Sequence, residues 1–235
     1  MLKSPWVAMG LTLLIALAWL RINDFFAHIG WVDSKLSRKI IHIGTGPVFV
    51  LCWLLFPDVP VSRFLAALVP AGISVQFAAV GLGLIKDQAS VDAMSRSGDR
   101  REILKGPLLY GIVFVVLTLA FWKTSVIGVI ALMTLCGGDG LGDVIGTRVK
   151  SVALKWSKNK TMAGTLGVFL GGLILSAFVL YVFVANGVFT GPMSGYLWRL
   201  AIIAFAAAAV ESLPLKDIDN VTVPLTVVLF GLILF

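Results

Sequence analysis

The sequence predicts an all-α bundle of membrane-spanning helices, and its composition is the first observation behind that prediction. Of the 235 residues, 59% are hydrophobic and 13% are charged, and the mean hydropathy is +0.99. Soluble domains carry about 25% charged and about 45–50% apolar residues, so a soluble globule could not cover this much apolar surface. The composition excludes a cytosolic enzyme, a secreted disulfide scaffold and a disordered chain.

The second observation is a series of apolar runs whose lengths suit a lipid bilayer. A helix needs about 20 mostly apolar residues to cross the hydrocarbon core, with about 17–25 as the working range, and an open sheet cannot satisfy its backbone in lipid. Only Lys123 separates the fourth run from the fifth, which predicts a tight helical hairpin or one broken pair. Without an internal repeat, we expect a single membrane domain over residues 1–235 with eight spans, or seven as the alternative. The runs are 5–20, 40–57, 62–85, 107–122, 124–146, 164–185, 197–213 and 221–235.

The first apolar run resembles a secretory signal peptide, because Lys3 precedes it and the small residues Ala16 and Ala18 lie near its end. A charge bias towards the following segment keeps that segment in the cytoplasm. We therefore expect the run to be retained as a span. The basic residues that follow it are Arg21, Lys35, Arg38 and Lys39.

The third observation is that charge gathers on one face of the predicted bundle. The loops after odd-numbered spans hold 15 of the 19 Lys and Arg residues. Basic residues favour cytoplasmic loops, so this face should be cytoplasmic and both termini should lie on the other side. The same bias explains the net charge of +7 without nucleic acid. The loops are 21–39, 86–105, 148–160 and 211–220.

The carboxylates follow the same distribution, although Asp and Glu do not set topology. All of the twelve acidic residues except Asp58 fall on or beside the basic face. This grouping indicates a site for a polar, anionic substrate. Cys52 and Cys136 lie in apolar runs instead, so we expect them to be packing residues and not a disulfide or metal pair.

The densest signal is a group of aspartates and glycines at the end of the fifth run. Asp139 and Asp143 are four residues apart and share one helix face, beside a stripe made by Gly138, Gly142 and Gly146. Two like charges so placed repel each other unless a cation lies between them, and Mg²⁺ commonly takes one or two carboxylates together with substrate phosphates. The alternative is a glycine packing face with aspartates that merely end the span. We expect the glycines to pack in either case, but ionisable groups at the bilayer edge are costly and functional by default.

A run of basic residues follows, with no acid from 144 to 210. Ammonium groups beside the start of a helix can hold phosphates, and the position directly after the aspartate pair favours that interpretation. Ordinary cytoplasmic charge or contact with anionic lipid head groups is the alternative. The run contains Arg148, Lys150, Lys155, Lys158 and Lys160, and Gly164 and Thr165 begin the sixth span.

Three weaker signals lie on the same face. His42 follows Arg38 by four residues, so the two side chains share a helix face and could bind an anion, although a lone His in a span usually makes an ordinary hydrogen bond. The loop at 96–102 alternates in charge and could simply be solvated. Glu211 ends an apolar helix, where a charged residue is costly, and this position indicates a functional role. Exposed acidic residues in loops, such as Asp217, usually have no such role.

Taken together, these pieces resemble the phytol kinases and their relatives, the CTP-dependent polyprenol and dolichol kinases. Five motifs match in order between about residues 35 and 225, and together they are more specific than any one alone. They are Arg38-Lys39-x-x-His42; Arg96-Ser97-Gly98 through Glu102 to Gly106-Pro107-Leu108-x-Tyr110; Gly138-Asp139-Gly140-x-x-Asp143-x-x-Gly146; Lys158-Asn159-Lys160-Thr161-x-Ala163-Gly164-Thr165; and Glu211-Ser212-Leu213-Pro214 with Asp219-Asn220-x-Thr222-x-Pro224.

The resemblance implies a membrane kinase that moves the γ-phosphoryl group of CTP to the hydroxyl of an isoprenoid alcohol, with Mg²⁺ held by Asp139 and Asp143. The active site is expected at segments 35–46, 94–110, 137–165 and 211–222. The expected catalytic residues are Asp139, Asp143, Lys158, Lys160, Glu211 and His42, with Asp219 a further candidate for the proton acceptor. The expected nucleotide-binding residues are Arg38, Lys39, Gly138, Gly140, Lys158, Asn159, Lys160, Asp219 and Asn220.

Two other functions compete with this one. A cytidylyltransferase that makes a CDP-activated lipid would also use CTP and Mg²⁺, but it would break the bond at the α-phosphate. A transporter would place charges at mid-membrane and show two related halves, which this sequence does not. No organellar transit segment is visible, which favours a prokaryotic cell membrane or a processed chain in a plastid-type membrane, with the site facing the cytoplasm.

Overall fold

The computed structural model describes residues 1–29, 31–32, 34–95, 97–214 and 218–235. Within these residues, seven helices are long and apolar enough to cross a membrane, which confirms the predicted all-α polytopic fold. The run at 221–235 forms α10 (Asp219–Leu234), an apolar helix of 16 residues that is shorter than the other candidates. The number of described helices that are long enough to cross a membrane is therefore seven, the lower of the two expected counts.

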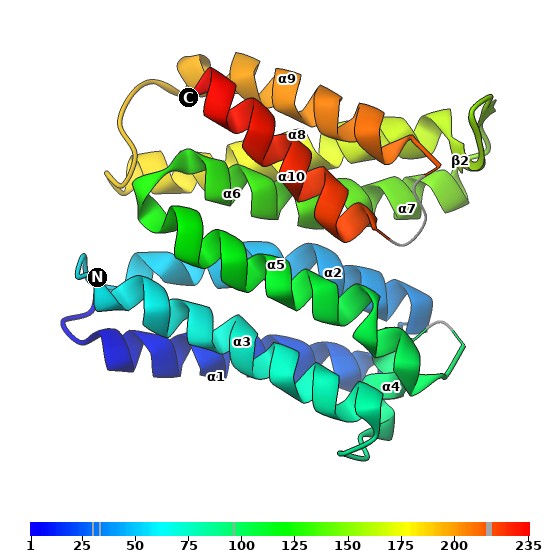
Figure 1. Ribbon diagram of the computed structural model, residues 1–235, viewed down its shortest axis with the longest axis horizontal. Helices are drawn as coiled ribbons and strands as arrows, with labels where there is room; N and C mark the ends of the chain where they lie inside the picture. Colours follow the sequence, from blue (N-terminus) through cyan, green and yellow to red (C-terminus); the bar gives the residue numbers. More distant parts are fainter. Residues whose placement is uncertain (30, 33, 96, 215–217) are drawn as a thin grey trace. The chain divides into compact units, whose positions relative to one another are not determined.

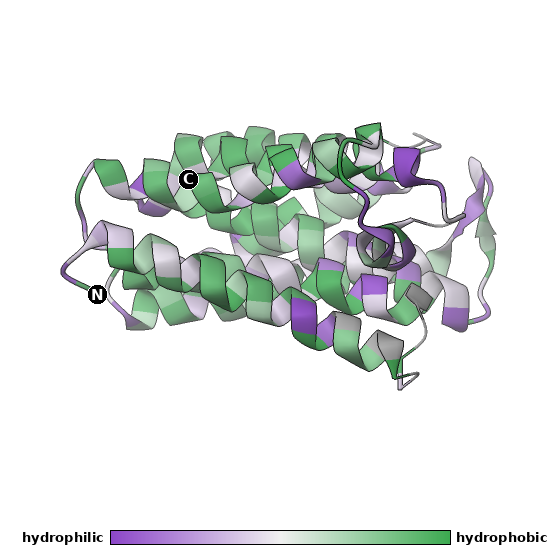
Figure 2. Ribbon diagram, turned by 90° about the horizontal axis from the view of Figure 1, so that it is seen from below, coloured by the Kyte–Doolittle hydropathy of each residue, from purple (hydrophilic) through white to green (hydrophobic). Residues whose placement is uncertain are grey.

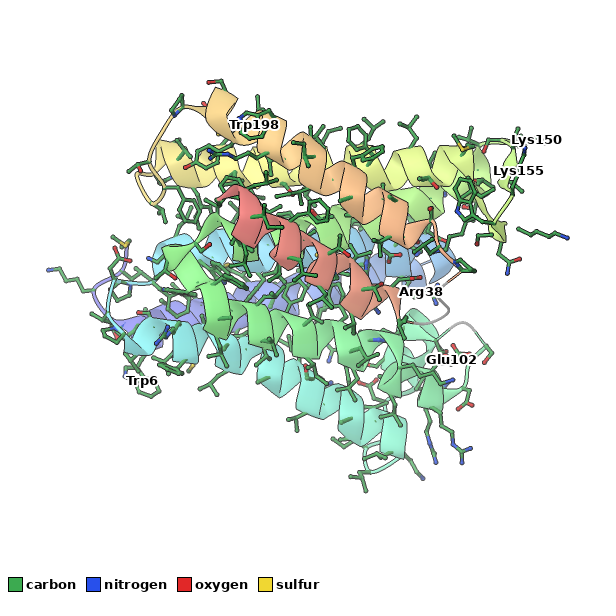
Figure 3. All side chains as sticks on the ribbon, turned by 45° about the horizontal axis from the view of Figure 1, so that its top comes forward. Trp6, Arg38, Glu102, Lys150, Lys155 and Trp198 are labelled. Atoms are coloured by element: carbon green, nitrogen blue, oxygen red, sulfur yellow. The ribbon has the colours of Figure 1, made fainter. Side chains whose placement is uncertain are left out.

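The chain forms two compact units, Met1–Leu119 and Ala120–Phe235, and each is described by itself. The expected single domain over residues 1–235 stays a prediction. Figure 2 shows apolar residues along the helices and hydrophilic residues concentrated towards helix ends and loops. In Figure 3, Arg38 and Glu102 lie at one end of the first unit and Trp6 lies at the other.

The first unit is a helical bundle in which α1 packs against α2 and α3. A proline at position 70 lies inside α3, and Gly83 ends that helix in the left-handed conformation with φ of 80°. Its elements, drawn in blue to green in Figure 1, are α1 (Pro5–His28), α2 (Ser34–Leu51), η1 (Cys52–Leu55), α3 (Val61–Leu82), α4 (Gln88–Met94), η2 (Arg100–Leu104) and α5 (Gly106–Phe121), which ends just inside the second unit.

The second unit begins with the turn predicted at Lys123. This turn is the short 3₁₀ helix η3 (Trp122–Thr124), and the Ser125 hydroxyl caps the next helix by accepting a hydrogen bond from the Ile127 N–H at 3.2 Å. The remaining elements are α6 (Val126–Met133), η4 (Thr134–Asp139), α7 (Gly140–Arg148), β1 (Ala153–Leu154), β2 (Ser157–Thr161), α8 (Met162–Ala185), α9 (Met193–Glu211) and α10.

The span made of α6, η4 and α7 is the centre of the second unit. In the most apolar 18-residue stretch of this span, 83% of the residues are buried, whereas the corresponding share is 17–50% in the other candidate spans. Helices α8, α9 and α10 all contact it, whereas α8 leaves Ile174, Phe178 and Tyr181 exposed. Large apolar side chains can remain exposed in lipid, because the bilayer is as apolar as they are. The most enclosed helix is thus the one that carries Asp139 and Asp143.

Glycines let this central span approach α8 closely, as the sequence predicted for a glycine packing face. A Cβ atom on Gly137 would lie 2.5 Å from the Gly171 carbonyl oxygen and 2.9 Å from the Leu175 Cβ atom. A Cβ atom on Gly142 would lie 3.2 Å from the Gly164 carbonyl oxygen. Backbone therefore packs on backbone along a glycine seam, the contact of Gly137, Gly138, Gly142 and Gly146 with Gly164, Gly167, Gly171 and Gly172.

An antiparallel hairpin, β1–β2, follows α7, and the sequence did not predict it. Leu154 pairs with Ser157 and Ala153 with Thr161, with an irregularity between the two pairs. The hairpin carries Lys158 and Lys160 on its longer strand. Two residues of β1 are too few for a period-two pattern to be detectable.

We expect Gly137→Ala to destabilise the protein, because its Cβ atom would meet backbone that cannot move aside. Overpacking of a closely packed contact typically costs about 1–3 kcal/mol, so the midpoint of thermal unfolding in detergent should fall. Gly72→Ala on α3 is the matched control, since nothing lies within 4 Å of its Cβ position. Equal midpoints for the two variants would contradict the glycine seam.

Candidate active site

The first feature of the candidate site is a π-helical segment that ends at the predicted metal ligand. Thr134–Asp139 is π-helical between two α-helical segments. Such single-turn interruptions occur often at functional sites. Asp139 is partly buried at the end of the π-helix and Asp143 is exposed in the first turn of α7. The two predicted metal ligands thus lie one helical turn apart.

The two aspartates provide only part of the ligand set that a metal needs. No group of three His, Cys, Asp or Glu side chains comes together among the residues that the structure describes. A pair of carboxylates, one of them exposed, still suits Mg²⁺, which keeps several waters and binds through one or two carboxylates and substrate phosphates. The donor chemistry fits Mg²⁺ and does not resemble a closed, all-protein metal cage.

The second feature is a charged cluster around Lys160. Its Nζ atom lies 2.6 Å from a carboxylate oxygen of Glu211 and 3.6 Å from one of Asp219, and it also donates to the Glu211 carbonyl oxygen. The charge of Asp139 also acts on Glu211. Three predicted site residues from β2, α9 and α10 therefore meet, and they meet within electrostatic range of a predicted metal ligand.

Partial burial increases the free energy that this cluster contributes to stability. The side chains of Lys160 and Glu211 are 22% and 13% exposed, so neither charge is fully hydrated. An ion pair that is partly withdrawn from water is screened less than a surface pair, and losing one member leaves the other poorly solvated. The cluster therefore holds β2 against the ends of α9 and α10.

The third feature is the start of α8, where the predicted phosphate-binding segment ends. The Met162 N–H donates to the Val152 carbonyl oxygen at 3.0 Å, the Ala163 N–H to the Ser151 hydroxyl at 3.0 Å and the Gly164 N–H to the Thr161 hydroxyl at 3.1 Å. These three backbone donors are thus satisfied within the chain. A phosphate in this region would therefore have to be held by the ammonium groups of β2 and not by these amides.

The remaining residues of this segment differ in exposure. Lys158 and Asn159 are exposed on β2, and Asn220 is partly buried in the first turn of α10. Gly138 and Gly140 are buried where the π-helix meets α7. In Figure 3, Lys150 and Lys155 lie at the end of the second unit that carries the hairpin, and Trp198 lies at the opposite end.

In the first unit, the structure brings together two motifs that lie far apart in the sequence. The Tyr110 hydroxyl donates to the His42 carbonyl oxygen at 2.9 Å, and the two ring centroids are 4.6 Å apart. Arg38 and Lys39, both partly buried, lie one turn before His42 on α2. The expected meeting of these residues with Asp139 in one site stays a prediction.

The loop before α5 is built from its own polar side chains. The Ser97 hydroxyl donates to the Glu102 carboxylate at 2.7 Å, and the Asp99 carboxylate caps η2 by accepting from the Arg101 N–H at 2.9 Å. Charged residues of this loop thus form hydrogen bonds within the loop itself, and this local role explains part of the alternating charge in the sequence. Arg96, in the same motif, lies outside the described residues, as does Asp217.

A small cavity of about 60 Å³ lies in the first unit, and one of its lining residues, Met94, begins the predicted segment 94–110. Next to it, the Asp87 carboxylate caps α4 by accepting from the Ser90 hydroxyl at 2.6 Å and from the Ser90 N–H at 3.0 Å. These hydrogen bonds, that from the hydroxyl first, hold the pKa of Asp87 below its usual value. None of the predicted site residues is among the cavity's lining side chains, which are those of Leu17, Leu20, Arg21, Ile73, Gln76, Phe77, Ser90 and Met94.

Two residues of the predicted segment 137–165, Trp156 and Ser151, make contacts that were not predicted from the sequence. The indole Nε1 of Trp156 donates to the Ser212 carbonyl oxygen at 3.1 Å, and Ser151 caps α8 as described. A tryptophan in a strongly polar segment was a visible signal, but its partner is 56 residues away. The cap by Ser151 depends on the hairpin, which was not predicted.

The chain is similar over almost its whole length to curated plant proteins. Farnesol kinase, chloroplastic, of Arabidopsis thaliana is 39% identical over 234 residues, which cover 99% of this chain and 76% of that protein. Probable phytol kinase 3, chloroplastic, of Glycine max is 37% identical, with 99% and 73% covered. Probable phytol kinase, chloroplastic, of Triticum aestivum is 37% identical, with 96% and 77% covered. No protein-family model and no solved structure matches the chain.

We expect Lys160→Met to lower the free energy of unfolding by about 1.5–3 kcal/mol, the range for hydrogen bonds that involve charged groups. Adding Glu211→Gln should cost less than the sum of the two single changes, because the single variant leaves the other charge unpaired. Lys158→Met, on the same strand but exposed, should stay within about 0.5 kcal/mol of the parent. Denaturant unfolding in detergent measures the parent, the variants Lys160→Met, Glu211→Gln and Lys158→Met, and the double variant, and strict additivity would contradict the cluster.

Proposed function

This chain belongs to the phytol kinase family, and we propose that it transfers the γ-phosphoryl group of CTP to the hydroxyl of an isoprenoid alcohol such as phytol, giving phytyl phosphate and CDP. The relatives' names, farnesol kinase and probable phytol kinase, support the alcohol as substrate. The observation that best supports a phosphoryl-transfer site is the Lys160 cluster, which lies within electrostatic range of Asp139.

The proposal assigns Mg²⁺ to Asp139 and Asp143, with the metal supplying positive charge that offsets the charge of the nucleotide phosphates. The glycine seam supports this assignment. It anchors α7 on α8, so the two carboxylates project from a helix whose position is fixed. A metal ligand must be of the right chemical type, and the surrounding structure must also hold it in position.

Lys158 and Lys160 are assigned to the phosphates, with Arg38 and Lys39 of the first unit as further candidates. Phosphoryl transfer needs positioning and charge stabilisation more than covalent chemistry from the protein. Lys160 has carboxylate partners at 2.6 and 3.6 Å. A triphosphate that draws its ammonium group away would leave those carboxylates without their counter-charge.

That exchange suggests where the hydroxyl proton goes. Once Lys160 neutralises phosphate, Glu211 or Asp219 becomes a stronger proton acceptor, because a nearby cation lowers the basicity of a carboxylate. Either can then take the proton of the attacking hydroxyl as general base. His42, whose ring contacts Tyr110, is the alternative acceptor from the first unit.

The apolar tail of the alcohol is proposed to lie in the bilayer while its hydroxyl reaches the charged end of the helices. We place that end in the cytoplasm, or on the equivalent side of a plastid-type membrane, because basic residues concentrate there. The relatives named as chloroplastic support the plastid alternative. The exposed apolar residues along α8 fit contact with lipid.

The first test uses purified protein in liposomes with phytol, Mg²⁺ and CTP labelled at either the α- or the γ-phosphate, with parallel reactions on phosphatidic acid. We expect label from the γ position in a lipid-soluble phosphate. Label from the α position would identify a cytidylyltransferase instead. No transfer from either, by folded protein, would contradict both and direct the next experiment to transport.

Sealed vesicles of known orientation complete this test, since CTP does not cross a bilayer. Activity should appear only where the hairpin β1–β2 faces the added nucleotide. Activity from the opposite side would overturn the proposed orientation and leave the reaction itself unaffected.

We expect Asp139→Asn and Asp143→Asn each to lower kcat by about 10²–10³-fold, the typical loss when one preorganised electrostatic group is removed from an active site. Asp58→Asn is the matched control, because Asp58 is the acidic residue that lies away from the charged face. Initial rates measured over a Mg²⁺ series should show reduced apparent Mg²⁺ affinity in the first two variants only. Full activity in correctly inserted variants would refute the metal assignment.

A further inference from the structure

Trp156, in the turn between β1 and β2, combines a fixed ring with an exposed surface. It is 58% exposed, yet its indole Nε1 donates to the Ser212 carbonyl oxygen at 3.1 Å and contacts the Ser212 hydroxyl at 3.3 Å. Ser212 is buried, and its hydroxyl donates to the Ala209 carbonyl oxygen at 2.6 Å. One edge of the indole is thus anchored while much of its surface stays open.

The ring is close to the residues proposed to bind phosphate. Its partner Ser212 directly follows Glu211, the partner of Lys160. Lys158 and Lys160 lie on β2 with one residue between them, and Trp156 lies in the turn directly before that strand. At about 3.3 Å per residue, the backbone of Trp156 lies within about 13 Å of that of Lys160. The aromatic ring and the two ammonium groups therefore belong to one short segment of the hairpin.

The hydrogen bond of the indole argues against a simple membrane anchor. A tryptophan at the membrane interface keeps its N–H for water and head groups while its ring enters the apolar layer. Here the N–H is satisfied within the protein, and the exposed part is the ring itself. A fixed aromatic surface loses little conformational entropy when a flat ligand stacks on it.

We propose that the indole of Trp156 is the platform on which the nucleobase of the phosphoryl donor stacks, while Lys158 and Lys160 bind its phosphates. This inference rests on the proposed function for the identity of the ligand as a nucleoside triphosphate. Stacking on an aromatic side chain tolerates every base. Trp156 therefore contributes affinity for the nucleoside, and the choice of cytosine depends on other contacts.

The test compares Trp156→Phe with Trp156→Leu in the full chain purified in detergent. Both changes remove the hydrogen bond to Ser212, but only phenylalanine can stack. Equilibrium dialysis gives the Kd of labelled CTP in the presence of Mg²⁺, and competition gives the Kd of inorganic tripolyphosphate, which has no base. Trp6→Ala, an exposed tryptophan of α1, is the control for the loss of an indole.

We expect Trp156→Leu to raise the Kd of CTP about tenfold, within the range measured when a stacking aromatic is removed. Trp156→Phe should change it by less than threefold. The Kd of tripolyphosphate should stay within twofold of the parent in every variant. Trp6→Ala should leave both constants unchanged.

Two results would overturn the proposal. Equal losses of CTP and tripolyphosphate in both Trp156 variants would mean that the indole acts by positioning Lys160 through Ser212. An unchanged Kd for CTP in Trp156→Leu would mean that no base stacks there. Failure of the kinase reaction is a separate result: Trp156-dependent CTP binding together with transfer of the α-phosphate would contradict the proposed reaction and support the platform.

Discussion

The contact of backbone with backbone between α7 and α8 is the constraint on which the rest of the second unit depends. A charged helix end in a membrane protein needs a rigid support, because carboxylates held close together repel each other and would separate on a loose element. Glycines on both sides of the contact remove the side chains that would keep the helices apart, as between Gly142 and Gly164. The close approach buries the span that carries Asp139 and leaves its polar end accessible. Support and site thus lie on the same segment, where Gly138 and Gly142 directly precede Asp139 and Asp143.

Lys160 plays the corresponding part for the elements that meet at that end. The hairpin, α9 and α10 contribute one charged residue each, and the ammonium group pairs with Glu211 and Asp219. These pairs stabilise the arrangement, and on the proposed function a bound phosphate would compete with the two carboxylates for the same ammonium group. The stability of the site and the binding of substrate would then depend on one interaction. One interaction is expected to serve both roles where a protein must keep charged side chains in position before a ligand binds.

The parts of this molecule that could be predicted from sequence are those that depend on local patterns. Apolar runs predicted the helices because length and hydropathy suffice in lipid, and the four-residue spacing of Gly138 and Gly142 predicted a packing face. The π-helix, the hairpin and the Trp156–Ser212 hydrogen bond could not be predicted. A π-helix has no strong sequence pattern, β1 is two residues long, and the hydrogen bond joins residues 56 apart. The pairing of Lys160 with Glu211 was missed for the same reason, although both residues were identified as site residues.

The charges gathered in the second unit give a further argument for a divalent cation. The predicted catalytic and nucleotide-binding residues of this unit include four carboxylates, those of Asp139, Asp143, Glu211 and Asp219, and two ammonium groups, those of Lys158 and Lys160. By themselves these six residues carry two more negative than positive charges. A divalent cation would restore the balance, and the proposed nucleotide could then approach through the lysines. The other basic residues near the hairpin would add a longer-range attraction. On the proposed function the metal and the nucleotide would therefore bind together, because the cation would neutralise the aspartates and the phosphates at once.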